Sequence, residues 1–325
     1  MIRQPDMLRG PSVNEQSTAR TIHPVYQGNM FGFLNCDKPI GFSSRDLVNI
    51  VQGRLRGRKV KVGHCGTLDP LASGVLVVGV GPAARLTPFV HEASKSYRAT
   101  FRLAAESPTG DMEFEPTLYP DHPIPTAQEL ASACRSLTGR IEQIPPAYSA
   151  IKVDGKRAYV MAREGQDVVM PARKVHVEAI EILSYQYPDL QLQITCGTGT
   201  YIRTLGMDVA KAVGTVAVMT SLVRTRVGEF SISDSVSETQ LRENEIESLL
   251  LPAAIGVSHL PQMIVNADEC KRLANGLCLG TRQPDTPGAA GEDPEHVAAI
   301  TPDGHLKAIL VQKQSSWCPK RVFPD

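Results

Sequence analysis

A polar loop bounded by glycines leads directly into an apolar segment in the sequence Val62-Gly-His-Cys-Gly-Thr-Leu-Asp-Pro-Leu-Ala-Ser-Gly-Val-Leu-Val-Val-Gly-Val80. Residues 74–80 do not alternate between polar and apolar, which predicts a strand buried on both faces. Asp69 lies in the loop just before this strand. Loops held by a rigid scaffold often carry chemistry, so Asp69 is a candidate active-site carboxylate. An aspartate before proline is nevertheless more often a turn or capping residue, and the loop alone does not decide between these interpretations.

Patterns on both sides of this stretch predict a mixture of strands and helices. Residues 97–103 alternate between apolar and polar side chains, which predicts a half-buried strand. Ser43 and Thr126 each stand three residues before a carboxylate and predict capped helix N-termini. Further strands are expected at 31–36, 175–182 and 190–196, and further helices at 201–213, 237–250 and 267–275. The helix at 237–250 is strongly acidic and is interpreted as a solvated face.

The chain of 325 residues is long enough for about two domains. Residues 1–29 contain few large apolar side chains and are expected to form a disordered tail. The character of the sequence changes near residue 258, which predicts a main domain at 30–258 and a small β-rich domain at 259–325. Within the second domain, residues 297–312 predict a hairpin, and the Pro/Gly-rich residues 284–294 predict a flexible loop.

The composition excludes several classes of protein. Lys and Arg together number 34, as do Asp and Glu, so a wholly cationic coat for nucleic acid is excluded, whereas a local basic patch is not. The seven cysteines are odd in number and no pair has C-x-x-C spacing, which argues against a disulfide scaffold and a structural zinc site. This usage favours a reducing cytoplasm. No apolar signal segment begins the chain, and every apolar stretch is shorter than the ~20 residues of a membrane span, so we expect a cytoplasmic protein without membrane contact.

Two glycines, Gly197 and Gly199, precede the helix expected at 201–213, which carries Arg203. A helix N-terminus with free N–H groups suits phosphate. The spacing is not that of the dinucleotide motif G-x-G-x-x-G, so no nucleotide cofactor is expected. Arg203 by itself is most often a surface residue in such a position.

Basic residues concentrate on the N-terminal side of the Asp69 loop. Between residues 31 and 62 the chain carries seven Lys or Arg and only two Asp. The cations are Lys38, Arg45, Arg54, Arg56, Arg58, Lys59 and Lys61. Such a cluster is often only a solvated face, but beside a candidate active-site loop it also suits a polyanion, which would bind with release of counterions. Arg224 and Arg226 extend the same possibility.

Five separated motifs together resemble the TruB family of tRNA pseudouridine synthases, and they occur in the order found in that family. They are Asp37-Lys-Pro-Ile-Gly-Phe-Ser-Ser44, Val62-Gly-His-Cys-Gly-Thr-Leu-Asp-Pro-Leu-Ala-Ser-Gly-Val-Leu76, Lys95-Ser-Tyr97, Ile144-Pro-Pro-Ala-Tyr-Ser-Ala-Ile-Lys-Val-Asp-Gly-Lys-Arg-Ala-Tyr159 and Gly199-Thr-Tyr-Ile-Arg-Thr-Leu205. Agreement at five motifs is far more specific than a match to one.

The resemblance implies an α+β fold, in which a mixed, mostly antiparallel sheet flanked by helices forms the catalytic core. It implies a small β-rich, PUA-like RNA-binding domain at the C-terminus. The implied activity is isomerisation of one uridine in the T loop of tRNA to pseudouridine, without cofactor or metal. The expected partner is therefore the T arm of tRNA, and the expected state is a monomer. Two alternatives stay open: an RNA-guided pseudouridine synthase of the related branch, and a tRNA-binding folding chaperone without catalysis.

The resemblance also implies catalytic roles for three residues. Asp69 is the catalytic aspartate, Arg203 pairs with that carboxylate, and Tyr97 stacks on the flipped base. These roles agree with elementary chemistry, because a base inside a stack must be extruded before an enzyme can reach it. A nearby guanidinium favours the ionised form of a carboxylate.

Other residues are expected to bind the RNA. The resemblance implies that His64 inserts into the RNA loop and helps to displace the base, that Leu222 lines the pocket, and that Lys38 supports the loop or the RNA. The remaining candidates for RNA binding are the cations Arg54, Arg56, Arg58, Lys59 and Lys61. Residues 107–114 depart from the family pattern, which leaves the role of Asp111 open.

Overall fold

The computed structural model describes residues 30–149, 151–153, 155–288 and 294–324. The tail expected at 1–29 lies outside the described residues, as does part of the loop expected at 284–294. The largest element is a ten-stranded sheet in which one neighbouring pair is parallel and the others are antiparallel. A separate four-stranded sheet lies near the C-terminus. The prediction of a mixed, mostly antiparallel α+β fold with a β-rich C-terminal region is therefore confirmed.

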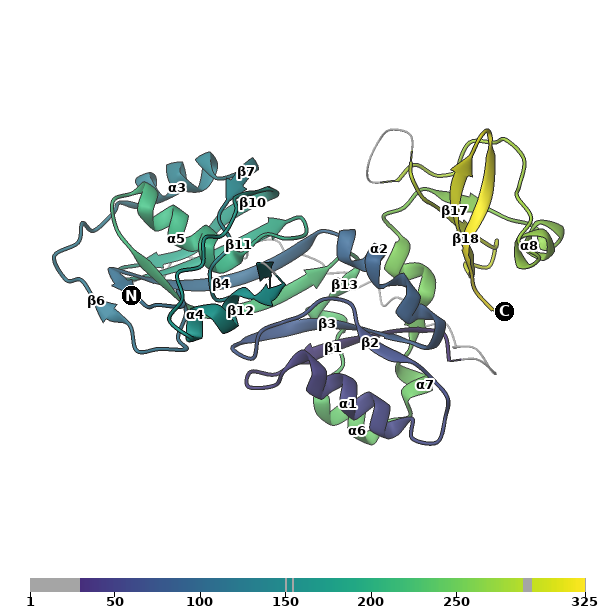
Figure 1. Cartoon of the computed structure of the whole chain (residues 1–325), viewed down its shortest axis with the longest axis horizontal. Helices are drawn as coiled ribbons and strands as arrows, with labels where there is room; N and C mark the ends of the chain where they lie inside the picture. Colours follow the sequence, from purple (N-terminus) through teal and green to yellow (C-terminus); the bar gives the residue numbers. More distant parts are fainter. Residues whose placement is uncertain (1–29, 150, 154, 289–293, 325) are drawn as a thin grey trace, which may run out of the picture.

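The main sheet extends across the molecule (Figure 1). Its strands in spatial order are β14 (Leu251–Pro252), β1 (Gly32–Lys38), β3 (Ala72–Val80), β12 (Ala217–Val227), β4 (Lys95–Leu103), β11 (Asp189–Cys196), β10 (Arg173–Gln186) and β7 (Gly139–Gln143). Two short strands, β2 (Val62–His64) and β13 (Phe230–Ser231), pair with β3 and β12. Small hairpins are formed by β5 (Ala105–Glu106) with β6 (Thr117–Leu118) and by β8 (Lys152–Val153) with β9 (Lys156–Arg157). The parallel pair is β3 with β12.

Helices cover the sheet at both ends. The α-helices are α1 (Ser44–Arg54), α2 (Thr87–Glu92), α3 (Ala127–Ser136), α4 (Ala158–Arg163), α5 (Ile202–Ala212), α6 (Glu238–Glu243), α7 (Ile246–Leu249) and α8 (Ala267–Ala274). Short 3-10 helices are η1 (Gly81–Leu86), η2 (Ile232–Asp234) and η3 (Ala253–Val257). In Figure 1, α3 and α5 lie together over β4, β10 and β11, and α1 and α6 lie beside β1 and β3.

The apolar run in β3 is buried on both faces, as its lack of alternation predicts. Val75 and Val77 face a core shared with η1 and α2. Leu76 and Val78 face a second core shared with α1 and α6. By contrast, β4 buries only the face that carries Phe101, which packs against α3 and α5. The uninterrupted apolar pattern thus belongs to β3, which has a core on both faces, and the alternating pattern belongs to β4, which has a core on one face.

Helix caps form where the sequence predicts them, but the acidic helix does not continue. Ser43 and Thr126 each form a capping box with the carboxylate three residues later. The single helix expected at 237–250 is wrong, because the chain forms α6 and then α7 with two extended residues, Asn244 and Glu245, between them. That break allows Leu241 and Ile246 to be buried in the same core.

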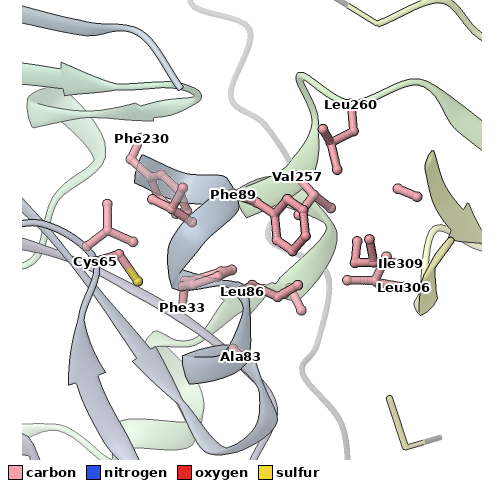
Figure 2. Packing of buried hydrophobic residues seen from close by; sticks show 14 of the residues in the cluster. Phe33, Cys65, Ala83, Leu86, Phe89, Phe230, Val257, Leu260, Leu306 and Ile309 are labelled. Carbon is pink, nitrogen blue, oxygen red and sulfur yellow. The ribbon is translucent and has the colours of Figure 1, made fainter. Parts of the chain in front are cut away.

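The C-terminal sheet contains β15 (Gln262–Ile264), β16 (Val297–Ile300), β17 (Leu306–Lys313) and β18 (Ser316–Val322). The predicted hairpin is confirmed as β16 with β17. Alternate residues of β16 serve two cores: Ala299 packs under α8, while Ala298 joins the core of the main unit. Figure 2 shows part of that core, which contains Phe33 and Phe89 together with Leu306 and Ile309 of β17. The C-terminal sheet is therefore attached to the main sheet by apolar packing.

A disulfide joins Cys278 to Cys318. The argument from cysteine spacing against disulfides is wrong for this pair, because the pairing of Leu279 with Trp317 brings the two cysteines opposite each other. Spacing along the chain contains no information about this contact. Cys36, Cys65, Cys134 and Cys196 are buried free thiols.

No helix in the described ranges is long and apolar enough to cross a membrane.

The packing of α5 on β4 depends on a glycine. A Cβ at Gly206 would overlap the Phe101 ring, whereas a Cβ at Gly53 of α1 would have no atom within 4 Å. We expect Gly206→Ala to destabilise the protein by about 1–3 kcal/mol through overpacking. The matched Gly53→Ala substitution should stabilise it by up to about 1 kcal/mol through helix propensity. Urea unfolding of the two variants measures both effects, and equal stabilities would contradict the assigned packing.

Candidate active site

The Asp69 loop lies between β2 and β3 and is fastened to the first turn of α1. The buried Ser44 hydroxyl accepts a hydrogen bond from Leu68 N at 2.8 Å and donates one to Leu68 O at 3.0 Å. The Ala72 N–H donates to Asp69 O at 3.0 Å. The Asp69 side chain is exposed and has no hydrogen bond or ion pair with another described residue. The backbone next to this carboxylate is thus fixed while the carboxylate itself stays available.

A buried guanidinium holds the same loop from the side of the sheet. Arg224 of β12 is 4% exposed. Its Nε donates to Val75 O at 2.8 Å, its Nη1 to Thr67 O at 3.3 Å and its Nη2 to Gly66 O at 3.4 Å. It forms no ion pair with a carboxylate among the described residues. Arg224 therefore does not extend the basic surface; it supports the loop that carries Asp69.

Tyr97 lies opposite Arg224 in the pairing of β4 with β12. Burial raises the pKa of the Tyr97 phenol, and the neighbouring Arg224 charge opposes that shift only in part. The phenol is therefore neutral at physiological pH, and the ring is half-buried against the α5 core.

Arg203, in the first turn of α5, binds Asp111. Its Nη1 donates to Asp111 Oδ2 at 2.6 Å and to Thr109 O at 2.5 Å, and its Nη2 donates to Tyr148 O at 3.2 Å. The side chains of Arg203 and Asp111 are only 10% and 11% exposed. The predicted ion pair between Arg203 and Asp69 is therefore wrong in this structure.

Asp111 is also held by hydrogen bonds that do not involve the Arg203 guanidinium. Its Oδ1 accepts hydrogen bonds from Thr109 Oγ1 at 2.6 Å and from Glu113 N at 3.1 Å. Its main chain pairs with Met219 of β12. This preorganisation explains why Arg203 binds Asp111, the aspartate whose role the sequence left open, in preference to the exposed carboxylate of Asp69.

One cavity of about 270 Å³ brings the predicted catalytic residues together. Asp69, Tyr97 and Arg203 all line it, and so does Leu222. The other lining residues are Thr67, Leu68, Ala72, Tyr148, Ser149, Thr200, Tyr201, Ile202 and Met219. The lining thus contains one carboxylate and one guanidinium among mainly apolar and hydroxyl-bearing side chains. Within the described part of the chain, no three His, Cys, Asp or Glu side chains are grouped to hold a metal ion.

Sequence reasoning missed two kinds of residue here. Tyr148 lies within the motif that runs from Ile144 to Tyr159, but the sequence indicated no role for it. Met219 belongs to β12, a strand that the sequence did not predict. The signal for Tyr148 was present, since an aromatic residue in a Pro-rich segment beside the other motifs is a typical pocket residue.

His64 lies at the end of β2, outside the cavity lining. Burial, assisted by the charges of Arg224 and Arg45, lowers the pKa of its imidazole below the usual range. The ring is therefore neutral at pH 7. Its Nδ1 is buried without a hydrogen-bond partner in the described residues.

Lys38 is fully buried and holds the turn that follows β1. Its Nζ donates to Pro39 O at 3.0 Å and to Phe42 O at 2.6 Å. Burial lowers the pKa of this amine. Of the two predicted roles, support of the loop agrees with this geometry, and direct contact with RNA does not, because the side chain is 0% exposed.

The basic cluster at 54–61 is partly neutralised by the acidic segment of α6 and α7. Arg54 pairs with Glu245 at 3.6 Å, and Arg58 pairs with Glu247. The interpretation of the acidic segment as only a solvated face is therefore incomplete. The exposed cations of the cluster that form no ion pair with described residues are Arg56, Lys59 and Lys61.

Comparison with known proteins identifies close sequence relatives. Residues 54–202 match the family model described as TruB family pseudouridylate synthase, N-terminal domain. The tRNA pseudouridine synthase B of Rhodopirellula baltica is 41% identical, and the match covers 93% of this chain and 97% of the relative. The protein of the same name from Corynebacterium efficiens is 37% identical, with 87% and 92% covered. That of Dehalococcoides mccartyi strain CBDB1 is 35% identical, with 90% and 97% covered.

Solved structures share the fold. A Cbf5-Nop10-Gar1 complex contains a chain that superposes with a TM-score of 0.69 at 24% identity, covering 90% of this chain and 85% of that chain. An H/ACA RNP bound to a substrate RNA containing 2'-deoxyuridine gives the same TM-score and identity, with 91% and 86% covered. At this identity the likeness establishes the fold alone.

The role of Arg224 is testable by hydrogen exchange. Arg224→Met should leave three carbonyl groups without their donor, and each missing hydrogen bond costs about 0.5–1.5 kcal/mol. We therefore expect the amides of residues 65–68 to exchange at least ~10-fold faster, and Arg224→Lys to give an intermediate rate because it keeps the charge without the fork. Arg226→Lys, on the exposed end of the same strand, is the control. Unchanged protection of the loop in Arg224→Met would contradict the role.

Proposed function

The chain belongs to the TruB family of pseudouridylate synthases, and on that premise we propose that it isomerises a uridine of tRNA to pseudouridine without a cofactor. The C–N glycosidic bond of the uridine breaks, the base rotates, and a C–C bond forms to the same ribose. The observation that carries the proposal is the convergence of Asp69, Tyr97 and Arg203 on one small cavity.

A single available carboxylate suits an isomerase better than a hydrolase. Glycoside hydrolases use two carboxyl groups, one of them to activate water. Here Asp69 is the carboxylate that lines the cavity, and the Asp111 carboxylate is occupied by Arg203. Asp69 must be ionised to attack or to remove a proton. A mainly apolar lining limits the water that would otherwise hydrolyse the intermediate.

Arg203 places a guanidinium in the same cavity as Asp69 without bonding to it. The guanidinium lines the cavity while Asp111 and two carbonyl groups fix its position. Asp111 is thus a positioning residue: it places the guanidinium and balances part of its charge.

Extrusion of the uridine costs a few kcal/mol. We assign Tyr97 to stack on the base in the cavity, because its ring is half-buried there and its phenol is neutral. We assign His64 to fill the space that the base leaves in the RNA. A neutral imidazole suits this role because its insertion among stacked bases does not require burial of a charge.

We assign the T arm of tRNA as the substrate element and residues 259–325 as a PUA-like RNA-binding domain. The catalytic domain then spans residues 30–258, and the protein acts as a cytoplasmic monomer. Support for a second RNA-binding unit comes from the four-stranded sheet and its own apolar core under α8. RNA phosphates would meet Arg56, Lys59 and Lys61, which are exposed beside α1 and form no ion pair with described residues.

The catalytic assignment is tested with a tRNA transcript that carries tritium at uridine C5. The purified protein alone should release tritium. Asp69→Asn should lose at least ~10⁴-fold in rate, as other enzymes do without their nucleophile. An Asp69→Asn variant with near wild-type rate would remove Asp69 from the role.

The same assay separates the alternatives. A guided enzyme needs guide RNA and partner proteins, so activity of the chain with tRNA alone excludes it. A folding chaperone needs no Asp69, so its RNA refolding would persist in Asp69→Asn when isomerisation is lost.

The phosphate contacts are tested by the salt dependence of tRNA affinity. Affinity should fall steeply as the salt concentration rises. The double variant Lys59→Gln/Lys61→Gln should reduce the slope of log affinity against log salt concentration by about 1 for each phosphate that it no longer neutralises. The control variant Arg140→Gln/Lys174→Gln changes cations at the β7–β10 end of the sheet. Equal slopes for the two double variants would reject the proposed phosphate binding.

A further inference from the structure

Two large apolar side chains are exposed beside the cavity. Met112 and Phe114, in the turn that follows Asp111, are each 44% exposed. They sit on a loop, where recognition residues are commonly placed.

The turn that carries them is rigid. Ser107 Oγ donates to Asp111 O at 2.6 Å, Glu113 N donates to Asp111 Oδ1 at 3.1 Å, and Met219 N donates to Gly110 O at 2.9 Å. An ion pair of 2.5 Å joins Glu113 to Arg163 of α4. Binding of a ligand here therefore costs little conformational entropy in the loop.

The Phe114 ring continues the wall of the cavity. It packs edge-to-face against Tyr148, with ring centroids 6.5 Å apart and planes at 61°. Tyr148 lines the cavity, and its carbonyl accepts a hydrogen bond from Arg203. The exposed ring thus lies one side chain away from the space assigned to the uridine.

Charge does not favour RNA at this turn. Asp111 and Glu113 are each paired with an arginine, but Glu115, next to Phe114 in the chain, is exposed and forms no ion pair with a described residue. What the turn offers to RNA is therefore the face of the aromatic ring.

We propose that Phe114, seated against Tyr148, is a stacking site for a second unpaired nucleobase of the RNA, the neighbour of the base that enters the cavity. The site takes any base, because every base presents a π-face and the ring offers no hydrogen bond. The inference rests on the proposed function. It adds a second nucleotide contact that holds the loop open while Asp69 reacts with the first.

The test is a binding cycle in the Asp69→Asn background, which prevents turnover. Stacking contributes about 1–3 kcal/mol for each base, so Phe114→Ala should weaken affinity for unmodified tRNA by about 5- to 150-fold. Phe114→Trp should keep the affinity of the parent protein, because it keeps an aromatic ring on which a base can stack. Leu118→Ala removes another exposed apolar side chain of the same segment and should leave the affinity unchanged.

The partner base is identified with tRNAs that carry one abasic nucleotide on either side of the target uridine. If one of the two neighbouring bases stacks on Phe114, the tRNA that lacks this base should bind Phe114→Ala and the parent protein equally well. The proposal is overturned if Phe114→Ala binds tRNA as the parent does, or if its weaker binding persists in both abasic tRNAs. A wild-type protein that releases no tritium from tRNA overturns the proposed function and this inference together, whereas an active wild type with unaltered Phe114→Ala binding overturns the stacking site alone.

Discussion

The parallel pairing of β12 with β3 is the constraint on which the cavity depends. Through it, Arg224 lies opposite Gly74 of β3 on one side and opposite Tyr97 of β4 on the other. The backbones approach so closely that a Cβ at Gly74 would overlap the Arg224 carbonyl, and Gly74 has a φ of 99°. One strand therefore fixes both the start of β3, just after the Asp69 loop, and Tyr97, whose side chain lines the same cavity as Asp69.

Two buried guanidinium groups support this site: Arg203 lines the cavity, and Arg224 holds the loop that carries Asp69. Arg203 pairs with a carboxylate, whereas Arg224 donates to three carbonyl groups and forms no ion pair with a carboxylate of the described residues. A buried cation without a carboxylate partner discourages other positive charges nearby. The pKa of His64 is lowered by burial and by Arg224, and that of Lys95 falls to about 8 for the same two reasons. Positive charge behind the cavity thus comes mainly from Arg224, whose position is set by hydrogen bonds to the backbone and not by a carboxylate side chain.

The sequence predicted the elements whose residues carry a regular pattern. The double-sided burial of β3 and the capping boxes at Ser43 and Thr126 follow from local residue order, and the structure confirms them. The sequence pattern did not predict β12, because two bulges, after Met219 and after Arg224, interrupt the alternation of its side chains. The partner of Arg203 and the Cys278–Cys318 disulfide depend on which distant segments meet. No spacing along the chain specifies such contacts, so motifs gave the members of the site but not their pairing.

The apolar core in Figure 2 links the Asp69 loop to the C-terminal sheet. Cys65, at the start of that loop, and Ile309 of β17 belong to the same cluster of buried side chains. Phe31 stacks on Phe323 at 5.1 Å, and Arg85 lies over the same ring at 5.3 Å. Close-packed cores do not deform continuously, so the C-terminal sheet keeps a fixed distance from the cavity. An RNA that contacts both the cavity and the C-terminal sheet must therefore match that distance. The shape of the RNA then contributes to substrate selection independently of its base sequence.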